Sequence, residues 1–140
     1  MHIYTLHHFY RECFEKKIHA CRILQEKSTP LSNGRKGAYD FLIENADGKL
    51  TGVEVLTRPS KGKLKEKLPY KDHADEFIFV LPAHGMNFYK KPDTKKFRKV
   101  ARDKFFPKEF SEKKIKVLLL DMEKGTFSKK KAFSEVFNVR

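Results

Sequence analysis

The sequence predicts a single α/β domain in which helices cover a mixed β-sheet. Three observations lead to this prediction: an N-terminal segment with helical periodicity, two β-rich runs joined by an Asp-Gly turn, and two continuous apolar runs of strand length. The chain has 140 residues, of which 39% are hydrophobic, which is enough for one core and leaves little for a second. We therefore expect residues 1–140 to form one unit of packed layers.

The first half of the chain is expected to give a helix and a hairpin. Apolar residues recur mostly at spacings of three and four over residues 6–24, which predicts an amphipathic helix. Residues 28–34 are rich in Ser, Thr, Pro, Asn and Gly and predict a loop. Residues 38–44 and 50–57 flank Asp47-Gly48 and predict an antiparallel hairpin at the centre of the sheet.

The second half predicts two buried strands separated by helices. Residues 58–71 are dense in lysine and predict a basic loop leading to a short helix. The runs at 76–82 (EFIFVLP) and 115–121 (IKVLLLD) are typical of buried strands. Helices are predicted at 94–104 and at 128–136.

The charge balance favours a polyanionic partner. The 31 Lys and Arg residues against 18 Asp and Glu give a formal charge of +13, and residues 87–140 contribute ten of these charges. Nucleic acid, DNA ahead of RNA, is the first candidate, and an anionic membrane surface is the second. The apolar runs are too short to cross a bilayer, and no apolar leader opens the chain, so we expect a cytoplasmic protein.

A basic cluster is expected to hold the phosphate backbone. Any one of these side chains is more often only a solvated lysine, but the cluster around residues 94–104 has just Asp93 and Asp103 nearby. The predicted nucleic-acid-binding residues are Lys61, Lys67, Lys90, Lys91, Lys95, Lys96, Arg98, Lys99 and Arg102. Phe105, Phe106 and Phe110 lie among lysines and either stack on unpaired bases or pack in the core.

The hairpin carries two acids that are candidates for chemistry. Asp40 is on its first strand and Glu54 on its second, and a three-residue loop or a bulge would place them directly opposite each other. Two carboxylates facing the same way make a site for Mg²⁺ or Mn²⁺, whereas the alternative is an exposed cross-strand pair. Because both acids are embedded in apolar strands, their burial would require a partner.

At this point the chain resembles a known nuclease superfamily. The segments GAYDFLI (37–43), GVEVL (52–56), KLPY (67–70) and FIFVLP (77–82), together with the leading helix, are similar to the core of the PD-(D/E)xK nucleases over residues 5–82. The resemblance implies a restriction-endonuclease-like fold, and it leaves the basic part at 87–140 unassigned.

The resemblance also assigns roles within the hairpin. Asp40 and Glu54 would be metal ligands, with the backbone carbonyl of Val55 completing the set. The superfamily's lysine falls at position 56, where this chain has Leu56. A basic group is needed there to orient the attacking water and to offset charge on phosphorus.

Several residues can replace that lysine. Arg58 follows on the same strand face, and Lys63, Lys65 or Lys67 can enter from the next segment, an arrangement that the superfamily permits. A further acid can come from Glu12 or Glu26, and the sequence does not choose between them.

The expected function is therefore that of a Mg²⁺- or Mn²⁺-dependent endonuclease acting on DNA. The alternative is a non-catalytic nucleic-acid-binding protein with the same fold, for which Leu56 is the best argument; an RNA-binding or scaffold role is a third option. Homodimerisation stays open. No Gly-rich phosphate loop or nucleophile elbow is found, which argues against P-loop nucleotide hydrolysis and serine-type acyl transfer.

Overall fold

A mixed β-sheet forms the centre of the protein in a computed structural model, which describes residues 1–15, 22–31, 34–84 and 105–140. Within these residues the sheet has seven strands in the order β1-β2-β3-β4-β5-β6, and β7 also pairs with β5. The strands are β1 (Arg22–Pro30), β2 (Lys36–Glu44), β3 (Leu50–Val55), β4 (Glu76–Pro82), β5 (Ile115–Asp121), β6 (Thr126–Phe127) and β7 (Lys131–Ala132). Strands β3, β4 and β5 are parallel, and the other pairings are antiparallel. The predicted α/β class with a mixed sheet is thus confirmed.

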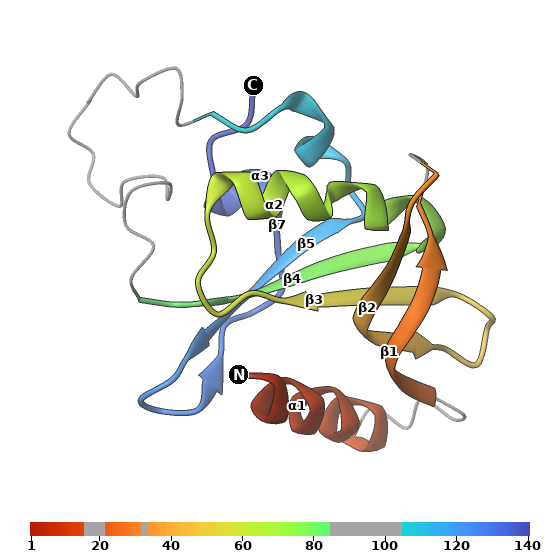
Figure 1. Cartoon of the computed structure of the whole chain (residues 1–140). Coiled ribbons are helices and arrows are strands. Elements are labelled where there is room, and N and C mark those ends of the chain that lie inside the picture. The colour runs from red at the N-terminus through yellow and green to blue at the C-terminus, as the bar shows by residue number, and fades with distance from the viewer. Residues whose placement is uncertain (16–21, 32–33, 85–104) are drawn as a thin grey trace.

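Helices lie on both faces of this sheet. Helix α1 (His2–Glu15) covers one face, whereas α2 (Lys61–Lys67) and α3 (Phe133–Val136) lie on the other (Figure 1). Two 3₁₀ segments, η1 (Leu68–His73) and η3 (Lys108–Ser111), add to the α2 side. None of the described helices is long and apolar enough to cross a bilayer.

The two faces bury separate apolar clusters. The cluster on the α1 side includes Phe9 of the helix and Val53 and Val55 of β3. The larger cluster on the α2 side is rich in phenylalanine, and its rings pack mainly edge-to-face or tilted at centroid distances of 4.6–6.4 Å. Its phenylalanines are Phe77, Phe79, Phe106, Phe110, Phe133 and Phe137.

The N-terminal prediction was partly wrong. The described part of the helix is His2–Glu15, residues 22–24 are not helical, and Arg22–Pro30 form β1, which includes the Ser-Thr-Pro segment expected to be a loop. Strand β1 forms one edge of the sheet and pairs with β2 from Arg22 opposite Glu44 to Pro30 opposite Lys36. Backbone pairing to β2 therefore overrides the helical spacing of its few apolar side chains.

The remaining elements agree with the sequence to different degrees. Strands β4 and β5 have the predicted bounds. The helix expected at 128–136 is reduced to α3, because Lys131–Ala132 pair with β5 instead. The helix expected at 94–104 lies outside the described residues.

The β2–β3 hairpin has the loop needed to align its two acids. Asn45 pairs with Lys49 through N–H to O at 2.9 Å, which leaves a three-residue loop that ends with Gly48 at φ +83°. Phe41 consequently stands opposite Val53 in the last pair of this ladder, and continuing the register by one residue would bring Asp40 opposite Glu54. The three-residue loop is thus the alternative that the structure selects.

Gly52 provides a test of the packing above this hairpin. An added Cβ at Gly52 would lie 2.5 Å from Cε1 of the buried Tyr39 ring. We expect Gly52→Ala to lower the free energy of unfolding by about 1–3 kcal/mol in urea denaturation, as overpacking does in a full core. The matched control is Gly62→Ala in α2, where the nearest atom is 4.0 Å away and helix propensity predicts a gain of about 0.5–1 kcal/mol. Equal effects of the two substitutions would contradict the packing of Tyr39 over β3.

Candidate active site

Glu54 is an acid buried in an apolar face of the sheet. Its neighbours Val53 and Val55 belong to the α1-side cluster, so strand alternation directs Glu54 to the opposite face, beneath α2. There it stands in register with the buried Phe79 of β4, and it is only 2% exposed. A carboxyl group in such surroundings is costly unless something compensates it.

The compensation within the chain is incomplete. Glu54 Oε1 is buried and has no hydrogen-bond partner among the described residues. Its other oxygen, Oε2, lies 3.8 Å from Nζ of Lys67. Leaving a buried acceptor unsatisfied costs about 1–3 kcal/mol, and the described residues do not offset this cost at Oε1.

Burial changes the protonation of Glu54. Desolvation, followed by the negative charge of Asp40, raises the pKa of Glu54 to about 8, although Lys67 acts in the opposite direction. Without a further cation, the carboxyl is therefore mostly protonated at neutral pH. Such a raised pKa in a compact cluster of charged groups is typical of functional sites.

Asp40 lies on the neighbouring strand and contacts both β3 and α1. Its Oδ2 accepts a hydrogen bond of 2.8 Å from the backbone N–H of Val55, and its Oδ1 lies 3.5 Å from Nε2 of His2 in α1. The first contact fixes Asp40 to β3 one residue beyond Glu54. The two carboxylates are thereby tied to the same stretch of the hairpin.

The backbone around Asp40 departs from regular strand geometry. Tyr39 packs in the α2-side cluster and Phe41 in the α1-side cluster, although regular alternation would put both on one face. On β1, Glu26 falls opposite Asp40 between the paired residues Gln25 and Lys27, and its φ is +51°. A positive φ outside glycine is uncommon and clusters at functional sites. Its exposed side chain keeps Glu26 as a candidate acid, whereas the side chain of Glu12 lies outside the described residues.

Lys67 brings a positive charge to the carboxylates. It projects from α2, is partly exposed, and its Nζ lies 4.9 Å from the ring centroid of Tyr70. Burial lowers the pKa of Lys67, but Glu54 and Tyr70 raise it, and the net result lies above the ordinary value. Lys67 is therefore charged beside Glu54. The sequence predicted it mainly as a residue that binds the phosphate backbone.

Tyr70, whose ring contacts Lys67, is held to the sheet through its backbone. The hydroxyl of Tyr39 donates to the backbone carbonyl of Tyr70, and burial raises the pKa of Tyr39 to about 12. Tyr39 therefore stays protonated and continues to donate over the working pH range. This bond fixes the segment that follows Lys67.

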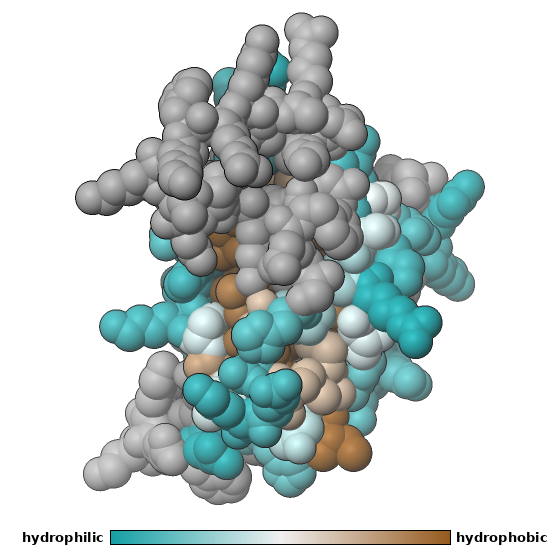
Figure 2. Space-filling view, turned by 90° about the vertical axis from the view of Figure 1, so that its left-hand side faces the viewer, coloured by the Kyte–Doolittle hydropathy of each residue, from teal (hydrophilic) through white to brown (hydrophobic). Residues whose placement is uncertain are grey.

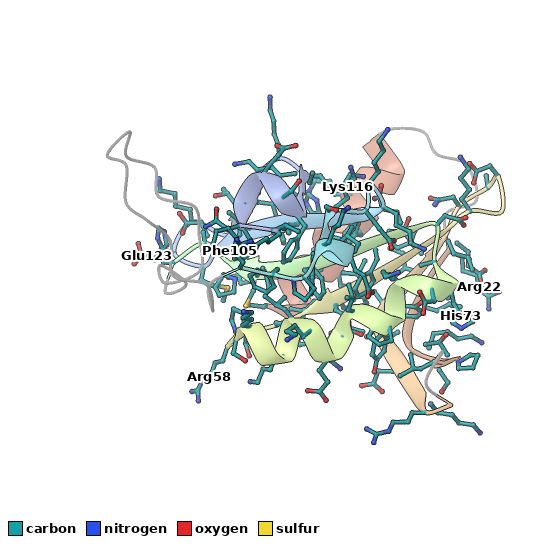
Figure 3. The ribbon with its side chains drawn as sticks, turned by 90° about the horizontal axis from the view of Figure 1, so that it is seen from above. Arg22, Arg58, His73, Phe105, Lys116 and Glu123 are labelled. Atoms are coloured by element: carbon teal, nitrogen blue, oxygen red, sulfur yellow. The ribbon has the colours of Figure 1, made fainter. Side chains whose placement is uncertain are left out.

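The other basic candidates are placed elsewhere. Arg58 is exposed and points away from the sheet (Figure 3). Lys63 donates to the carbonyl of Arg58 at 3.2 Å, and Lys65 lines a groove beside α2 together with Lys61. Leu56 packs against the α2-side cluster, so a lysine at that position would start from the same face as Glu54.

The predicted site residues and those observed at the site differ in three places. The predicted phosphate-binding residues between Lys90 and Arg102 lie outside the described residues. His2 was missed, because its contact with Asp40 depends on how α1 packs on the sheet. The position of Lys67 could have been noticed from the Leu64 and Leu68 spacing, which sets the buried side of α2 and leaves residue 67 at its flank.

The two acids have the oxygen ligands that Mg²⁺ or Mn²⁺ prefers, but they supply only part of a coordination shell. Oε1 of Glu54 is an unsatisfied oxygen, and Asp40 interacts with the Glu54 carboxyl group closely enough to raise its pKa, a combination that suits a hard cation. Among the described residues, no group of three or more His, Cys, Asp or Glu side chains comes together. Mg²⁺ commonly uses one or two carboxylates and completes its shell with water and substrate phosphate, so the pair is sufficient.

Comparison with known proteins adds no identification. No protein-family model, no curated protein and no solved structure matches the chain.

The raised pKa of Glu54 predicts a specific pH dependence of stability. Its pKa is 4.5 in an unfolded chain and about 8 when folded, so the folded state binds more protons and loses stability as the pH rises through this interval. In EDTA, we expect the free energy of unfolding of the wild type to fall relative to Glu54→Gln between pH 5 and pH 8, by up to about 4 kcal/mol. Urea denaturation at both pH values measures this. Parallel changes in the two proteins would show that Glu54 is not buried as an acid.

Proposed function

We propose that the protein is a metal-dependent endonuclease that hydrolyses phosphodiester bonds in DNA. The observation that carries the proposal is the buried Glu54, whose Oε1 has no partner among the described residues while Asp40 and Lys67 stand beside it. A hairpin bearing both acids, followed by a helix and a parallel buried strand, supports a restriction-endonuclease-like arrangement.

Each group has a role in this proposal. Asp40, Glu54 and the carbonyl of Val55 would hold Mg²⁺ or Mn²⁺. When bound, the ion would polarise a phosphoryl oxygen and lower the pKa of the attacking water. Lys67 takes the place of the motif lysine: its ammonium group donates to the water and offsets the negative charge that develops on phosphorus.

Lys67 comes from helix α2, whereas the superfamily's lysine comes from position 56, directly after β3. Leu56 fills its own position with apolar packing, while Lys67 approaches Glu54 from the layer above. This geometry weakens the argument that Leu56 favours a non-catalytic protein.

Binding of the substrate is supported by charge. The chain carries a formal charge of +13, and on the face seen in Figure 2 the described surface is mainly hydrophilic, with hydrophobic residues between. A positive surface attracts DNA and makes its affinity depend on salt.

The first test is cleavage of labelled linear, branched and single-stranded DNA in Mg²⁺, Mn²⁺ or EDTA. We expect metal-dependent cleavage that falls by at least about 100-fold in Asp40→Asn, Glu54→Gln and Lys67→Gln. Arg58→Gln and Lys63→Gln serve as matched variants, because both replace exposed basic residues close to α2 and should retain cleavage.

Two outcomes would oppose this assignment. DNA binding without cleavage in any metal would favour the non-catalytic alternative. Loss of cleavage in Arg58→Gln or Lys63→Gln, with Lys67→Gln still active and folded by circular dichroism, would move the basic role away from Lys67.

A second test follows metal binding without any substrate. Because Glu54 must lose its proton to bind a cation, the affinity for Mn²⁺ should rise about tenfold per pH unit up to about pH 8 and then level off. Calorimetry in buffers of different ionisation enthalpy should report release of about one proton per ion near neutral pH. Binding that is independent of pH in the wild type, or unchanged in Glu54→Gln, would exclude Glu54 as a ligand.

A further inference from the structure

A second site lies beside α2, outside the carboxylate cluster. It is an open groove of about 420 Å³ between the helix and the C-terminal part of the chain, within the range of about 300–1,000 Å³ that small ligands occupy. Its lining residues are Lys61, Lys65, Phe105, Phe106, Pro107 and Arg140. Seen from above, Phe105 lies between α2 and α3 (Figure 3).

The groove combines positive charge with an aromatic surface. Three of its six described lining residues have cationic side chains and none has an acidic one, and the cations are Lys61 and Lys65 of α2 and Arg140. A lining of this charge attracts an anionic ligand. The remaining residues are apolar, so the ligand must also have a non-polar, flat or compact part.

Phe105 differs from the neighbouring phenylalanines. Phe106 and Phe110 are 1% and 0% exposed and belong to the core, so they pack inside the protein and are not available to stack on bases. Phe105 is only half-buried, and the guanidinium of Arg140 lies 5.4 Å from its ring centroid. This contact holds the ring at the groove next to a positive charge.

The groove and the carboxylates lie on different flanks of one helix. Lys65 and Lys67 are two positions apart, which separates their directions by about 200° on an α-helix. Lys67 reaches Glu54, whereas Lys65 faces the groove. Since a helix with its side chains is about 10–12 Å across, one nucleic-acid strand can contact both.

We propose that this groove binds an unpaired nucleotide of a DNA strand, with its phosphate on Lys61, Lys65 and Arg140 and its base against Phe105. In a duplex both faces of each base are covered by stacking, so an aromatic ring in a concave site can be used only by an unpaired base. The inference rests on the proposed nuclease function for its substrate class, and it directs that function to DNA with a single-stranded segment.

The test measures binding with cleavage blocked. Fluorescence anisotropy in EDTA compares a labelled oligodeoxythymidine with a mixed-sequence duplex of equal length. We expect Phe105→Leu to weaken single-strand binding by about tenfold, the effect of losing one stacked base, and to leave duplex binding within about twofold. Phe105→Tyr, which keeps the ring, should bind like the wild type.

The charge component has its own control. Lys61→Gln/Lys65→Gln should reduce the slope of log affinity against log salt for the single strand by up to about 0.7, the value for the one phosphate that both lysines contact. The matched variant Lys124→Gln/Lys129→Gln removes two exposed lysines on either side of β6, outside the groove, and should leave the single-strand slope closer to that of the wild type.

The outcomes separate this inference from the proposed function. Equal single-strand binding by Phe105→Leu and the wild type, or equal salt slopes in the two lysine variants, overturns the groove as a nucleotide site whether or not the protein cleaves DNA. Weakened binding in the groove variants supports the site even if no metal-dependent cleavage is found. Circular dichroism and thermal unfolding of each variant establish that the differences arise from folded protein.

Discussion

The burial of the Glu54 carboxyl group is the interaction on which the site depends. An apolar residue in its place would pack against Phe79 without a desolvation cost, and replacing buried charged groups with apolar ones is often neutral or stabilising. The chain nevertheless keeps an acid there, adds Asp40 on the next strand, and gives it Lys67 as a counter-charge at 3.8 Å. Among the described residues, Lys67 lies beside Glu54, His2 contacts Asp40, and Oε1 of Glu54 has no partner. An added cation would satisfy both the charge and the open oxygen.

Helix α2 organises the surface above this acid. Leu64 and Leu68 fix its buried side against the sheet, and Ser60 caps its first turn by accepting from the N–H of Lys63 at 3.2 Å. Once that side is fixed, the 3.6-residue period sets the lysines on its flanks, with Lys67 toward Glu54 and Lys65 toward the groove. The dense lysines of this segment therefore do not form one uniform basic face. They are divided between a role beside the acids and a surface beside Phe105.

Those parts of the fold that depend on local pattern could be predicted, and those that depend on pairing could not. The buried strands β4 and β5 are apolar runs of strand length, and their bounds agree with the sequence. Strand β1 is different, because most of its side chains are exposed and its place is set by backbone bonds to β2. Its apolar residues Ile23 and Leu24 are adjacent and continue the helical spacing of the preceding segment, so periodicity favours the wrong element. An edge strand of this kind has no side-chain signature of its own.

The site was predictable to a similar degree and for a similar reason. Asp40 and Glu54 stand on a hairpin whose loop sets their register, so local sequence contains the information that aligns them. The motif of the resembled superfamily expects the lysine two residues after the second acid, in the same segment. This chain has Leu56 at that position and does not follow the motif there. The electrostatic requirement is only that an ammonium group stands near the carboxylates, whichever backbone it comes from. Lys67 meets it through the packing of α2 on β3, a contact between residues 13 positions apart that depends on how the helix sits on the sheet. Position 56 can therefore be apolar without removing the positive charge from the site, and Leu56 alone does not decide between a catalytic and a non-catalytic protein.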